Sequence, residues 1–529
     1  MPENLEILPS ISDYLAGENE YLALLTKPEA WSKIPLLNHA KLPENGSLVR
    51  FRGMIQDMLD PEFYLERYIV KTSEGERIQD GRFIDFLQFD EVSEEVDFSS
   101  SSNKHGERRC LFLVTIPGIN SWADEASFED EEVPEKRPKV ETGGSALSHE
   151  YLVNSPLPDR PSRACLTKIY SNFDAFRLNT VVDVLGFLSV DPSLDGSDEE
   201  VSNPEEHLAR NPPPHLIPRL HAISVREVLQ MNPFLQQIPS GENFQDISRD
   251  VLMMLTQCLF GDELAARYLF AHLISSIQSR VGLEILGKMC LNITNVPMEY
   301  PKSLYGVLEA ILPASYHLKM TLDNLNGQQF VPKKDYATGK LTSGVLQLAP
   351  KTHLLLDETL MAPGQLESGG IKAVHSLGNL IRHQSIEADF QYYTLDYECD
   401  VAVLILSEGK SLLPSDVMLP LKIDPEASQH IEETFKAAHQ FIRTKSRSIR
   451  DFLAGQKIAQ FDLDENIQAT VQEDLVAVRK AHNATPEELH GLLTLSRLVG
   501  KSLGKRNLDA DTWQLVRKMD EERRQRIRK

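Results

Sequence analysis

Alternating apolar and polar positions characterise the first third of the chain. Residues 48–55 alternate in this way, as a β-strand with one buried face does. Further runs rich in β-branched and aromatic residues follow at 63–70, 110–116, 164–170 and 181–190. Gly186 predicts a bulge in the last run. The five runs predict a small β-barrel of the OB type over residues 48–192, preceded by a helical segment over residues 1–47.

Two polar stretches interrupt this β region. Residues 91–109 are rich in Ser and Glu, and residues 120–163 carry a run of carboxylates with no Lys or Arg before Lys136. Neither stretch has enough apolar surface to offset the entropy lost on ordering, so we expect both to be disordered inserts. The basic residues 136–139 fit either a nuclear import signal or a solvated spot in a linker.

The pattern changes twice more along the chain. Residues 193–239 combine an acidic run with Pro212–Pro214, which predicts a linker. Residues 240–425 then alternate helical stripes with short apolar strands, which predicts an α/β domain. Residues 426–529 are helical in pattern and end in a basic tail. The whole chain is therefore expected to be of the α/β plus β class.

Charge and cysteine content exclude several classes of protein. The 529 residues include 55 Lys and Arg and 78 Asp and Glu, a net charge of −23, which argues against a protein built mainly to hold nucleic-acid backbones. The five cysteines are scattered, without the paired spacing of a zinc site, so no metal is expected. The chain begins without a basic stretch followed by an apolar run, and charged residues interrupt its most apolar stretch, 251–277. We expect a soluble intracellular protein.

One strand ending has the form of a Walker B element. Leu354–Leu356 are followed by Asp357 and Glu358. In P-loop ATPases the first carboxylate of this pair helps to hold Mg²⁺ and the second polarises the attacking water. An apolar strand that ends in two carboxylates is also common outside ATPases, so the match needs a Walker A element upstream.

The upstream segment keeps the order of a Walker A element without its glycines. A strand at 288–293 leads through a loop to Lys302 and Ser303, and a helix follows. The G-x-x-x-x-G-K-[ST] frame places its two glycines at Val296 and Pro301. Val disfavours the positive φ that a phosphate cradle needs, and Pro removes an N–H donor. We expect no nucleotide cofactor.

The other ATPase parts are also replaced. After the strand at 401–406, Ser407 stands where a sensor Asn is expected. Residues 485–498 are similar to the lid helix of an AAA+ domain, but Glu487 and Glu488 occupy the region of its sensor arginine. The pattern favours a degenerate AAA+-like domain with a helical lid, kept for its shape and without catalysis.

Several blocks resemble the mini-chromosome maintenance (MCM) complex-binding protein family. These blocks are residues 244–276, 330–359, 407–416, 218–222 and 232–234. The resemblance covers most of the chain and is weakest in the acidic inserts. It implies a non-enzymatic nuclear protein that binds subunits of the hexameric MCM helicase, in a complex lacking the second numbered subunit. It also implies roles in DNA replication and the cell cycle: maintaining the MCM pool, unloading MCM from chromatin, and sister-chromatid cohesion in dividing cells. Chromatin association would then be indirect.

Two other functions remain open. An active AAA+-type ATPase would use Lys302, Ser303, Asp357 and Glu358. An OB-fold protein that binds single-stranded DNA needs a basic groove with stacking aromatics. The residues that could form one are Arg50, Phe51, Arg52, Phe63, Tyr64, Arg67, Tyr68 and Lys71. Alternate members of these runs must face the core, so most of the aromatics are expected to serve packing.

Two further features have structural interpretations. His272 lies on an apolar helical stripe and is expected to be a packed core histidine. The basic end from Arg523 fits an import signal, a DNA contact or the favourable end of a helix dipole.

Overall fold

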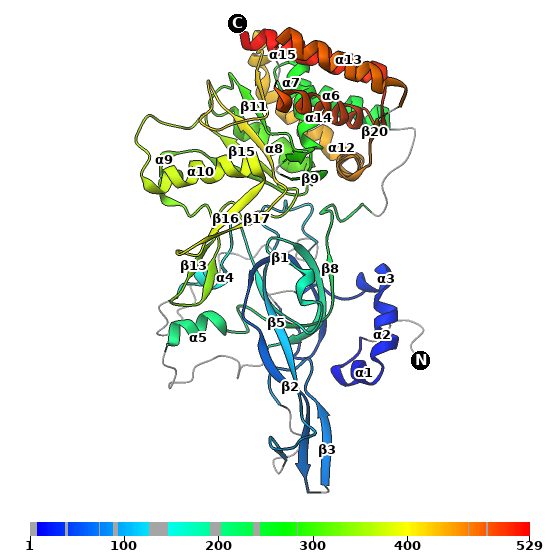
Figure 1. The fold of residues 1–529 in the computed structure, drawn as a ribbon, viewed down its shortest axis with the longest axis vertical. Helices are drawn as coiled ribbons and strands as arrows, with labels where there is room; N and C mark the ends of the chain where they lie inside the picture. The colour runs from blue at the N-terminus through cyan, green and yellow to red at the C-terminus, as the bar shows by residue number, and fades with distance from the viewer. Residues whose placement is uncertain are drawn as a thin grey trace.

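The computed structural model describes residues 8–37, 41–73, 75–87, 94–125, 147–190, 203–235, 244–282, 284–463, 465–482 and 485–528. These residues form fifteen α-helices and a large mixed sheet, so the predicted mixed class is confirmed. Figure 1 shows a β-barrel in its lower half and an α/β domain above it, with the carboxyl end at the top. The predicted import signal at 136–139 lies outside the described residues.

Five strands close into the barrel. They are β1 (Leu48–Met58), β5 (Lys104–Val114), β6 (Ala164–Ile169), β7 (Val181–Ser189) and β8 (Arg219–Glu227). The circuit runs β1-β7-β8-β6-β5, and β5 pairs back to β1. Within this circuit the β6–β8 pair is parallel and the other pairs are antiparallel. Alternate residues of each strand, such as Phe51, Leu113 and Val184, fill the interior.

Gly186 marks an irregularity in β7, as predicted. The register with β8 shifts between Leu185 and Gly186. A Cβ on residue 186 would lie 2.3 Å from the carbonyl oxygen of His221, so the two strands approach too closely there for any larger residue.

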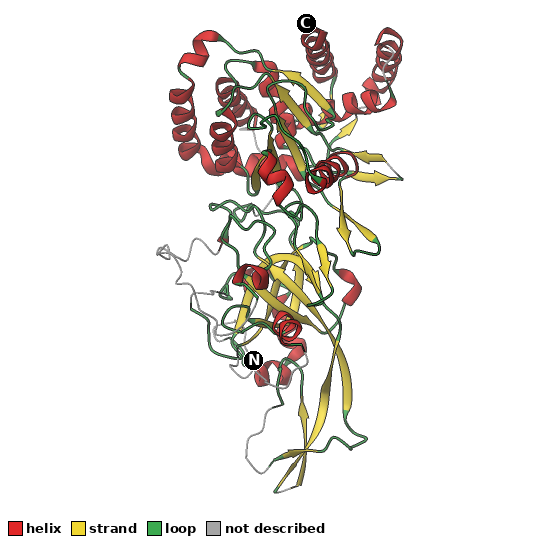
Figure 2. Cartoon of the chain, turned by 90° about the vertical axis from the view of Figure 1, so that its left-hand side faces the viewer, coloured by secondary structure: helices red, strands yellow, loops and turns green. Residues whose placement is uncertain are grey.

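The predicted strand at 63–70 exists but lies outside the barrel circuit. β2 (Glu62–Thr72) pairs with the first half of β5 and with β3 (Gly75–Asp80), and two residues of β4 (Glu95–Val96) join it. Figure 2 shows these strands as an arm that extends below the barrel. The remaining barrel strand is β8, which falls in the segment expected to be a linker. That expectation was wrong. The prolines of the segment suggest a linker, but the alternating residues of β8 pair with β6 on one side and with β7 on the other.

The segments expected to be disordered are partly structured. Residues 104–109 continue β5, because β2 offers them a pairing partner. Residues 147–163 include α4 (His149–Val153), whose Leu152 and Val153 are buried against the barrel. For these described parts the expectation of disorder was wrong. Residues 88–93 and 126–146 lie outside the described residues.

The amino-terminal segment is helical and covers one outer face of the barrel. Its helices are α1 (Ile11–Ala16), α2 (Glu18–Leu25) and α3 (Pro28–Trp31). Ser10 begins α1 with a capping box that includes Asp13. Tyr14 packs edge-to-face on Phe187 of β7, with ring centroids 5.7 Å apart.

Five parallel strands form the sheet of the upper domain. In chain order they are β11 (Leu291–Thr294), β12 (Ser315–Lys319), β15 (His353–Asp357), β18 (Ala402–Leu406) and β19 (Val417–Pro420). Across the sheet the order is β12-β15-β18-β11-β19, with every pair parallel. The three apolar strands predicted from the sequence are confirmed as β11, β15 and β18.

Helices cover both faces of this sheet. On one face α6 (Phe244–Cys258), α7 (Glu263–Leu273) and α8 (Tyr300–Ile311) share a core with strand residues such as Leu404. On the other face α10 (Ser368–His383) packs on residues such as Ile405. Because successive strand residues point to opposite faces, a continuous apolar run is needed to satisfy both cores.

A small second sheet follows the edge of the main one. Its order is β14-β13-β16-β17, which places β14 and β17 at its two ends. The strands are β13 (Lys333–Asp335), β14 (Lys340–Thr342), β16 (Ser385–Asp389) and β17 (Thr394–Glu398), and α9 (Leu322–Gly327) precedes them. Figure 1 shows β16 and β17 between the main sheet and the barrel.

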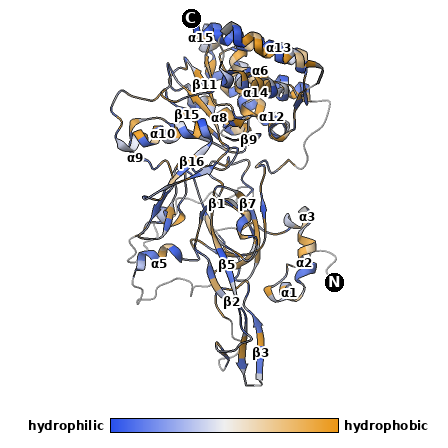
Figure 3. Cartoon of the chain, viewed as in Figure 1, coloured by the Kyte–Doolittle hydropathy of each residue, from blue (hydrophilic) through white to orange (hydrophobic). Residues whose placement is uncertain are grey.

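The last hundred residues are helical, as the pattern predicts. They contain α11 (Pro425–Gln429), α12 (Ile431–Ile458), α13 (Glu465–His482), α14 (Pro486–Ser502) and α15 (Ala510–Arg528). Figure 3 shows polar residues along the carboxyl-terminal end of α15. None of the helices in the described part of the chain is long and apolar enough to cross a membrane.

The basic end of α15 is held by carboxylates. Arg526 lies 2.5 Å and 3.0 Å from the two oxygens of Asp262, which is the N-cap of α7. Arg523 and Arg524 both bond to Asp520 one turn earlier. These contacts tie the carboxyl end of the chain to the start of α7, in addition to the favourable position of cations at a helix carboxyl terminus.

Candidate functional site

The Walker-like residues gather at the carboxyl edge of the parallel sheet. β11, β15 and β18 are parallel, so the loops that follow them leave from the same edge. The loop after β11 leads into α8, and Lys302 and Ser303 lie exposed in the first turn of that helix. Asp357 ends β15 and is 2% exposed. One strand, β18, separates β11 from β15, so the two strand ends lie about 10 Å apart.

The backbone donors of the loop after β11 are largely occupied. The N–H groups of Asn295 and Val296 donate to the carbonyl oxygens of Glu408 and Ser407, at 3.0 Å and 3.1 Å. The N–H of Tyr300 donates to the carbonyl of Pro297 at 3.3 Å. Pro297 and Pro301 have no N–H to offer. A phosphate cradle needs several backbone N–H groups directed at one anion. Here the N–H groups of Asn295 and Val296 are bonded to the loop after β18 instead.

Bulky and acidic side chains complete the loop. Val296 is 2% exposed and packs in the core. Tyr300 packs on Phe260 with ring centroids 4.9 Å apart, and its hydroxyl donates to the carbonyl of Cys258 at 2.8 Å. Glu299 is the N-cap of α8 and adopts a φ of 69°. Its carboxylate stands at the helix terminus where an anion would otherwise be favoured.

The two carboxylates at the end of β15 have protein partners. One oxygen of Asp357 accepts from the N–H and hydroxyl of Thr359, at 3.1 Å and 2.7 Å. The other oxygen lies 3.2 Å from Nε2 of His317. Glu358 accepts from the hydroxyl of Ser411 at 2.9 Å, and burial raises the pKa of its carboxyl group. Asp357 therefore has the contacts of a structural carboxylate.

The sensor positions are likewise occupied by structural contacts. The hydroxyl of Ser407 donates to Asn292 of β11 at 3.1 Å and ties the two strand ends together. Glu487 and Glu488 lie exposed in the first turn of α14, where carboxylates favour the helix dipole. No group of three or more potential metal-ligating side chains occurs within the described ranges. The five cysteines are buried and unpaired.

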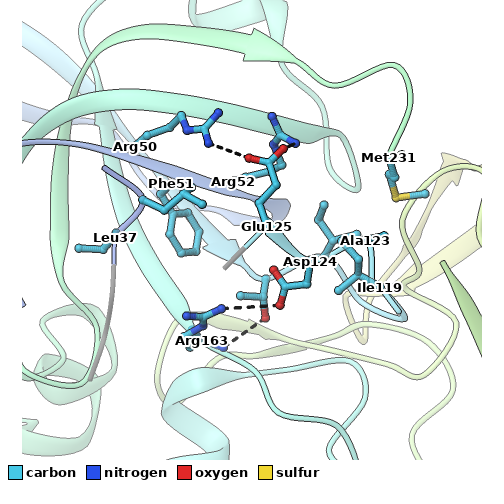
Figure 4. Close-up of a pocket in the computed structure, with 13 residues that line it drawn as sticks. Leu37, Arg50, Phe51, Arg52, Ile119, Ala123, Asp124, Glu125, Arg163 and Met231 are labelled. Atoms are coloured by element: carbon cyan, nitrogen blue, oxygen red, sulfur yellow. Dashed lines mark hydrogen bonds and ion pairs between the residues drawn. The ribbon is translucent and has the colours of Figure 1, made fainter. Parts of the chain in front are cut away.

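The basic residues of β1 face acidic partners at the rim of the barrel (Figure 4). Arg50 lies 2.7 Å from Glu125 and 3.3 Å from Asp183. Arg52 contacts Glu125 and lies 2.7 Å from Asp183. Beside them, Arg163 lies 3.8 Å from Asp124. The cavity they line has a volume of about 30 Å³, which admits water and is far too small for a nucleotide.

The aromatics that could stack on bases mostly serve packing. Phe51 and Tyr68 are 4% and 0% exposed. Tyr64 lies under the guanidinium of Arg108, 5.3 Å from its ring centroid. Phe63 is 78% exposed on the arm. The cations that could accompany it, Arg50 and Arg52, are already paired with carboxylates. The barrel rim therefore lacks the basic aromatic groove that single-stranded DNA binding requires.

The barrel is locked onto the α/β domain by a buried amide that sequence analysis missed. Asn120 is 0% exposed, and its side-chain amide donates to the carbonyl of Leu312 and the hydroxyl of Ser315, at 2.7 Å and 2.9 Å. Trp122 donates to the carbonyl of Glu309 at 3.1 Å. The guanidinium of Arg450 lies 3.9 Å from the Trp122 ring centroid. Both residues stand in a segment whose acidic composition gives no sign of burial.

A second contact joins the barrel to the small sheet. The amide of Gln56 donates to the carbonyl of Leu341 at 2.8 Å, and Asp57 accepts from the N–H of Leu341 at 2.9 Å. Lys340 is 3% exposed and donates to the carbonyl of Leu152 at 2.7 Å. Burial lowers the pKa of Lys340 to about 7. These paired polar groups fix the relative orientation of the two domains.

His272 behaves as the sequence predicts. It is 0% exposed, and its Nδ1 lies 2.9 Å from the carbonyl oxygen of Met289. Burial lowers the pKa of this histidine to about 4. The side chain is therefore a neutral core residue.

The fold and these sites define a two-domain protein. The charged and polar side chains of its candidate sites serve mainly to join strands, loops and the two domains to one another. The sequence profile described as mini-chromosome maintenance replisome factor matches residues 21–143 and 131–527, so the chain belongs to that family. A relative from Drosophila melanogaster, the mini-chromosome maintenance complex-binding protein, is 42% identical over 100% of this chain and 98% of its own length. Proteins of that name from Salmo salar and Homo sapiens are 32% and 30% identical, over 99% and 93% of this chain and 94% and 91% of their own lengths. The resemblance stated from the sequence is thereby confirmed.

Proposed function

We propose that this chain binds the MCM complex by presenting the outline of one of its subunits, without turning over nucleotide. The name of the relatives supports the partner: each is a mini-chromosome maintenance complex-binding protein. The single observation that carries the rest is the loop after β11, whose N–H groups at Asn295 and Val296 are bonded to Glu408 and Ser407.

The strand orders support the outline. The closed five-stranded circuit with its one parallel pair supports assigning the barrel to the OB type. Numbered by their place in the chain, the five parallel strands of the upper domain run 2-3-4-1-5, and this all-parallel sheet supports the AAA+-like assignment. α14 and its neighbours supply a helical lid. We therefore assign the upper domain as AAA+-like, with Val296, Pro301, Lys302 and Ser303 in place of a working Walker A element.

The same residues argue against an enzyme. A P-loop holds phosphate through converging N–H groups and a Lys, with a carboxylate placed on Mg²⁺. Here the N–H groups of Asn295 and Val296 are bonded to Glu408 and Ser407, and Asp357 is bonded to Thr359 and His317. At the interface between this chain and a neighbouring MCM subunit, this chain would therefore contribute no bound nucleotide to hold the two proteins together.

The cellular roles follow as part of the proposal. A subunit mimic with a net charge of −23 opposes DNA in the channel of a ring, so its complex with MCM subunits would be DNA-free. Such a complex suits maintenance of the MCM pool, unloading from chromatin and, through replication, sister-chromatid cohesion. The site of action would be the nucleus, the complex would lack the second numbered subunit, and chromatin contact would be indirect.

Binding to purified MCM subunits tests the proposal. The full chain is immobilised and incubated with each subunit and with subunit mixtures, with Mg-ATP and after removal of nucleotide by apyrase. We expect stable capture of MCM subunits in both conditions, with the second subunit excluded. Failure to capture any subunit would refute the partner, and capture that requires ATP hydrolysis by this chain would refute the mimic.

The single-stranded DNA alternative predicts a different result. Binding of oligothymidine at moderate salt, weakened by Arg52→Ala, would favour it over the mimic. The pairing of Arg52 with Glu125 and Asp183 argues against this outcome.

A further inference from the structure

The hairpin formed by β16 and β17 carries an unusual exposed surface. Tyr392 and Tyr393 at its tip are 85% and 54% exposed, and Leu395 in β17 is 44% exposed. The Tyr393 ring stacks on Phe390, with centroids 5.0 Å apart and planes 3° from parallel. The Tyr392 ring packs edge-to-face on Tyr336, which is itself 50% exposed. The rings are thus held in place while their outer faces meet solvent.

The backbone of β17 is open along one side. β17 ends the order β14-β13-β16-β17, and among the strands of the described residues it pairs with β16 alone. Phe390 donates to the carbonyl of Tyr393 at 3.0 Å, and Cys399 donates to the carbonyl of Gln384 at 2.9 Å. In an antiparallel pair the bonded residues alternate, so the N–H and C=O groups of residues 394, 396 and 398 point to the open side. An open edge of this kind is a template for another strand.

All charged residues of the hairpin are acidic. Residues 385–398 contain Glu387, Asp389, Asp396 and Glu398, and no Lys or Arg. Two cations lie near the hairpin. Arg280, in a separate two-stranded sheet, lies 3.7 Å from Glu398 and donates to the carbonyls of Gln384 and Cys399, and Lys333 of β13 stands opposite Asp389 in the register. Asp396 is exposed and has no ion pair among the described side chains. Natural edge strands are protected by charged side chains, Pro or a bulge, and β17 has neither Pro nor a bulge but carries carboxylates, so its charge disfavours acidic partners and leaves basic ones.

We propose that β17 is a docking edge for an extended segment of a partner protein in which Lys or Arg alternates with apolar residues. The segment adds as a strand to the three open backbone positions. Its cations lie on the face of Asp396 and Glu398 and reach the exposed ring of Tyr392 at the tip. Its apolar residues lie on the opposite face with Leu395. This surface is separate from the Walker-like loop and goes beyond the function proposed above.

Two other occupants fit the surface less well. Nucleic acid would stack on the tyrosines, but four carboxylates and the absence of cations in residues 385–398 oppose its phosphates. A second copy of this chain could pair edge to edge, but antiparallel pairing through β17 would bring Asp396 and Glu398 near their counterparts. Like charges opposite one another destabilise a sheet. A basic protein segment has no phosphates for the carboxylates to repel, and it places cations instead of like charges opposite Asp396 and Glu398.

Fluorescence anisotropy tests the proposal with the full chain. The probes are a labelled peptide of alternating Lys and Val, the same peptide with Glu for Lys, and labelled oligothymidine. The variants are Asp396→Lys, Tyr392→Ala with Tyr393→Ala, and Thr394→Pro, which removes an outward N–H and leaves the bonds to β16 intact. Glu76→Lys is the matched control, because it makes the same charge change on the exposed strand β3.

We expect the Lys-Val peptide to bind and the Glu-Val peptide not to bind. Asp396→Lys and the double Tyr variant each weaken binding about fivefold or more, and Glu76→Lys changes it by less than about twofold. Thr394→Pro also weakens binding. The proposal is overturned if the peptide does not bind, if Asp396→Lys matches its control, or if Thr394→Pro has no effect. Oligothymidine binding that depends on the tyrosines, or a dimer lost in Thr394→Pro, would equally overturn it. Circular dichroism confirms that each variant is folded.

Discussion

Removing the Asn120 amide should loosen the joint between barrel and α/β domain. The side chain makes three hydrogen bonds: two donated, to Leu312 and Ser315, and one accepted from the Ser315 hydroxyl at 3.2 Å. Each is worth about 1 kcal/mol, and a buried carbonyl left without a partner adds to the loss. Asn120→Ala should therefore lower the free energy of unfolding by about 2–4 kcal/mol.

Urea unfolding followed by tryptophan fluorescence and far-UV circular dichroism measures this change. The matched control is Asn507→Ala, because Asn507 is exposed and its side chain has no hydrogen bond within the described part of the chain. We expect the control to shift stability by less than about 0.5 kcal/mol. If Asn120→Ala also shifts it by less than about 0.5 kcal/mol, the amide does not hold the domains together and the reasoning fails.

Two further predictions concern His272 and the end of α15. The folded protein keeps His272 neutral with a pKa of about 4, whereas an unfolded histidine titrates near 6.5. The unfolded state thus binds more protons between these values, so the free energy of unfolding decreases as the pH is lowered from about 6.5 to about 4, by up to about 1.4 kcal/mol per pH unit. His272→Gln should reduce that slope in urea titrations at several pH values, and unchanged slopes would contradict the assignment. Arg526→Ala should lose about 1–3 kcal/mol from the Asp262 pair and raise hydrogen exchange in α15. Equal exchange in the variant and the wild type would show that α15 is held by its apolar face alone.

The sequence predicts elements better than it predicts their partners. The strands at 48–55 and 181–190 could be recognised because their periodicity is local. Which strands close the barrel depends on pairing between distant segments, so the sequence pattern wrongly predicts β2 in the circuit and a linker at β8. The polar composition of residues 104–109 predicts disorder, but β2 provides a hydrogen-bonding partner that offsets the cost of ordering them.

Some features of the candidate site can likewise be predicted from the sequence, and others cannot. The missing glycines at Val296 and Pro301 can be found from the sequence, because the motif fixes their positions. The contacts that occupy the Asn295 and Val296 donors cannot, because they come from the loop after β18, more than a hundred residues away. Asn120 gives no sequence signal at all. The acidic run begins at Asp124, four residues later, and contacts with the docked α/β domain bury Asn120.

We propose above all that the α/β domain has the outline of a ring ATPase subunit but cannot hold a triphosphate. Calorimetric titration of the purified chain with Mg-ATP tests this most directly. The account predicts no heat of specific binding at concentrations up to about 1 mM, the weak end of ordinary ligand binding. Saturable binding in the micromolar range, lost in Lys302→Ala, would contradict it.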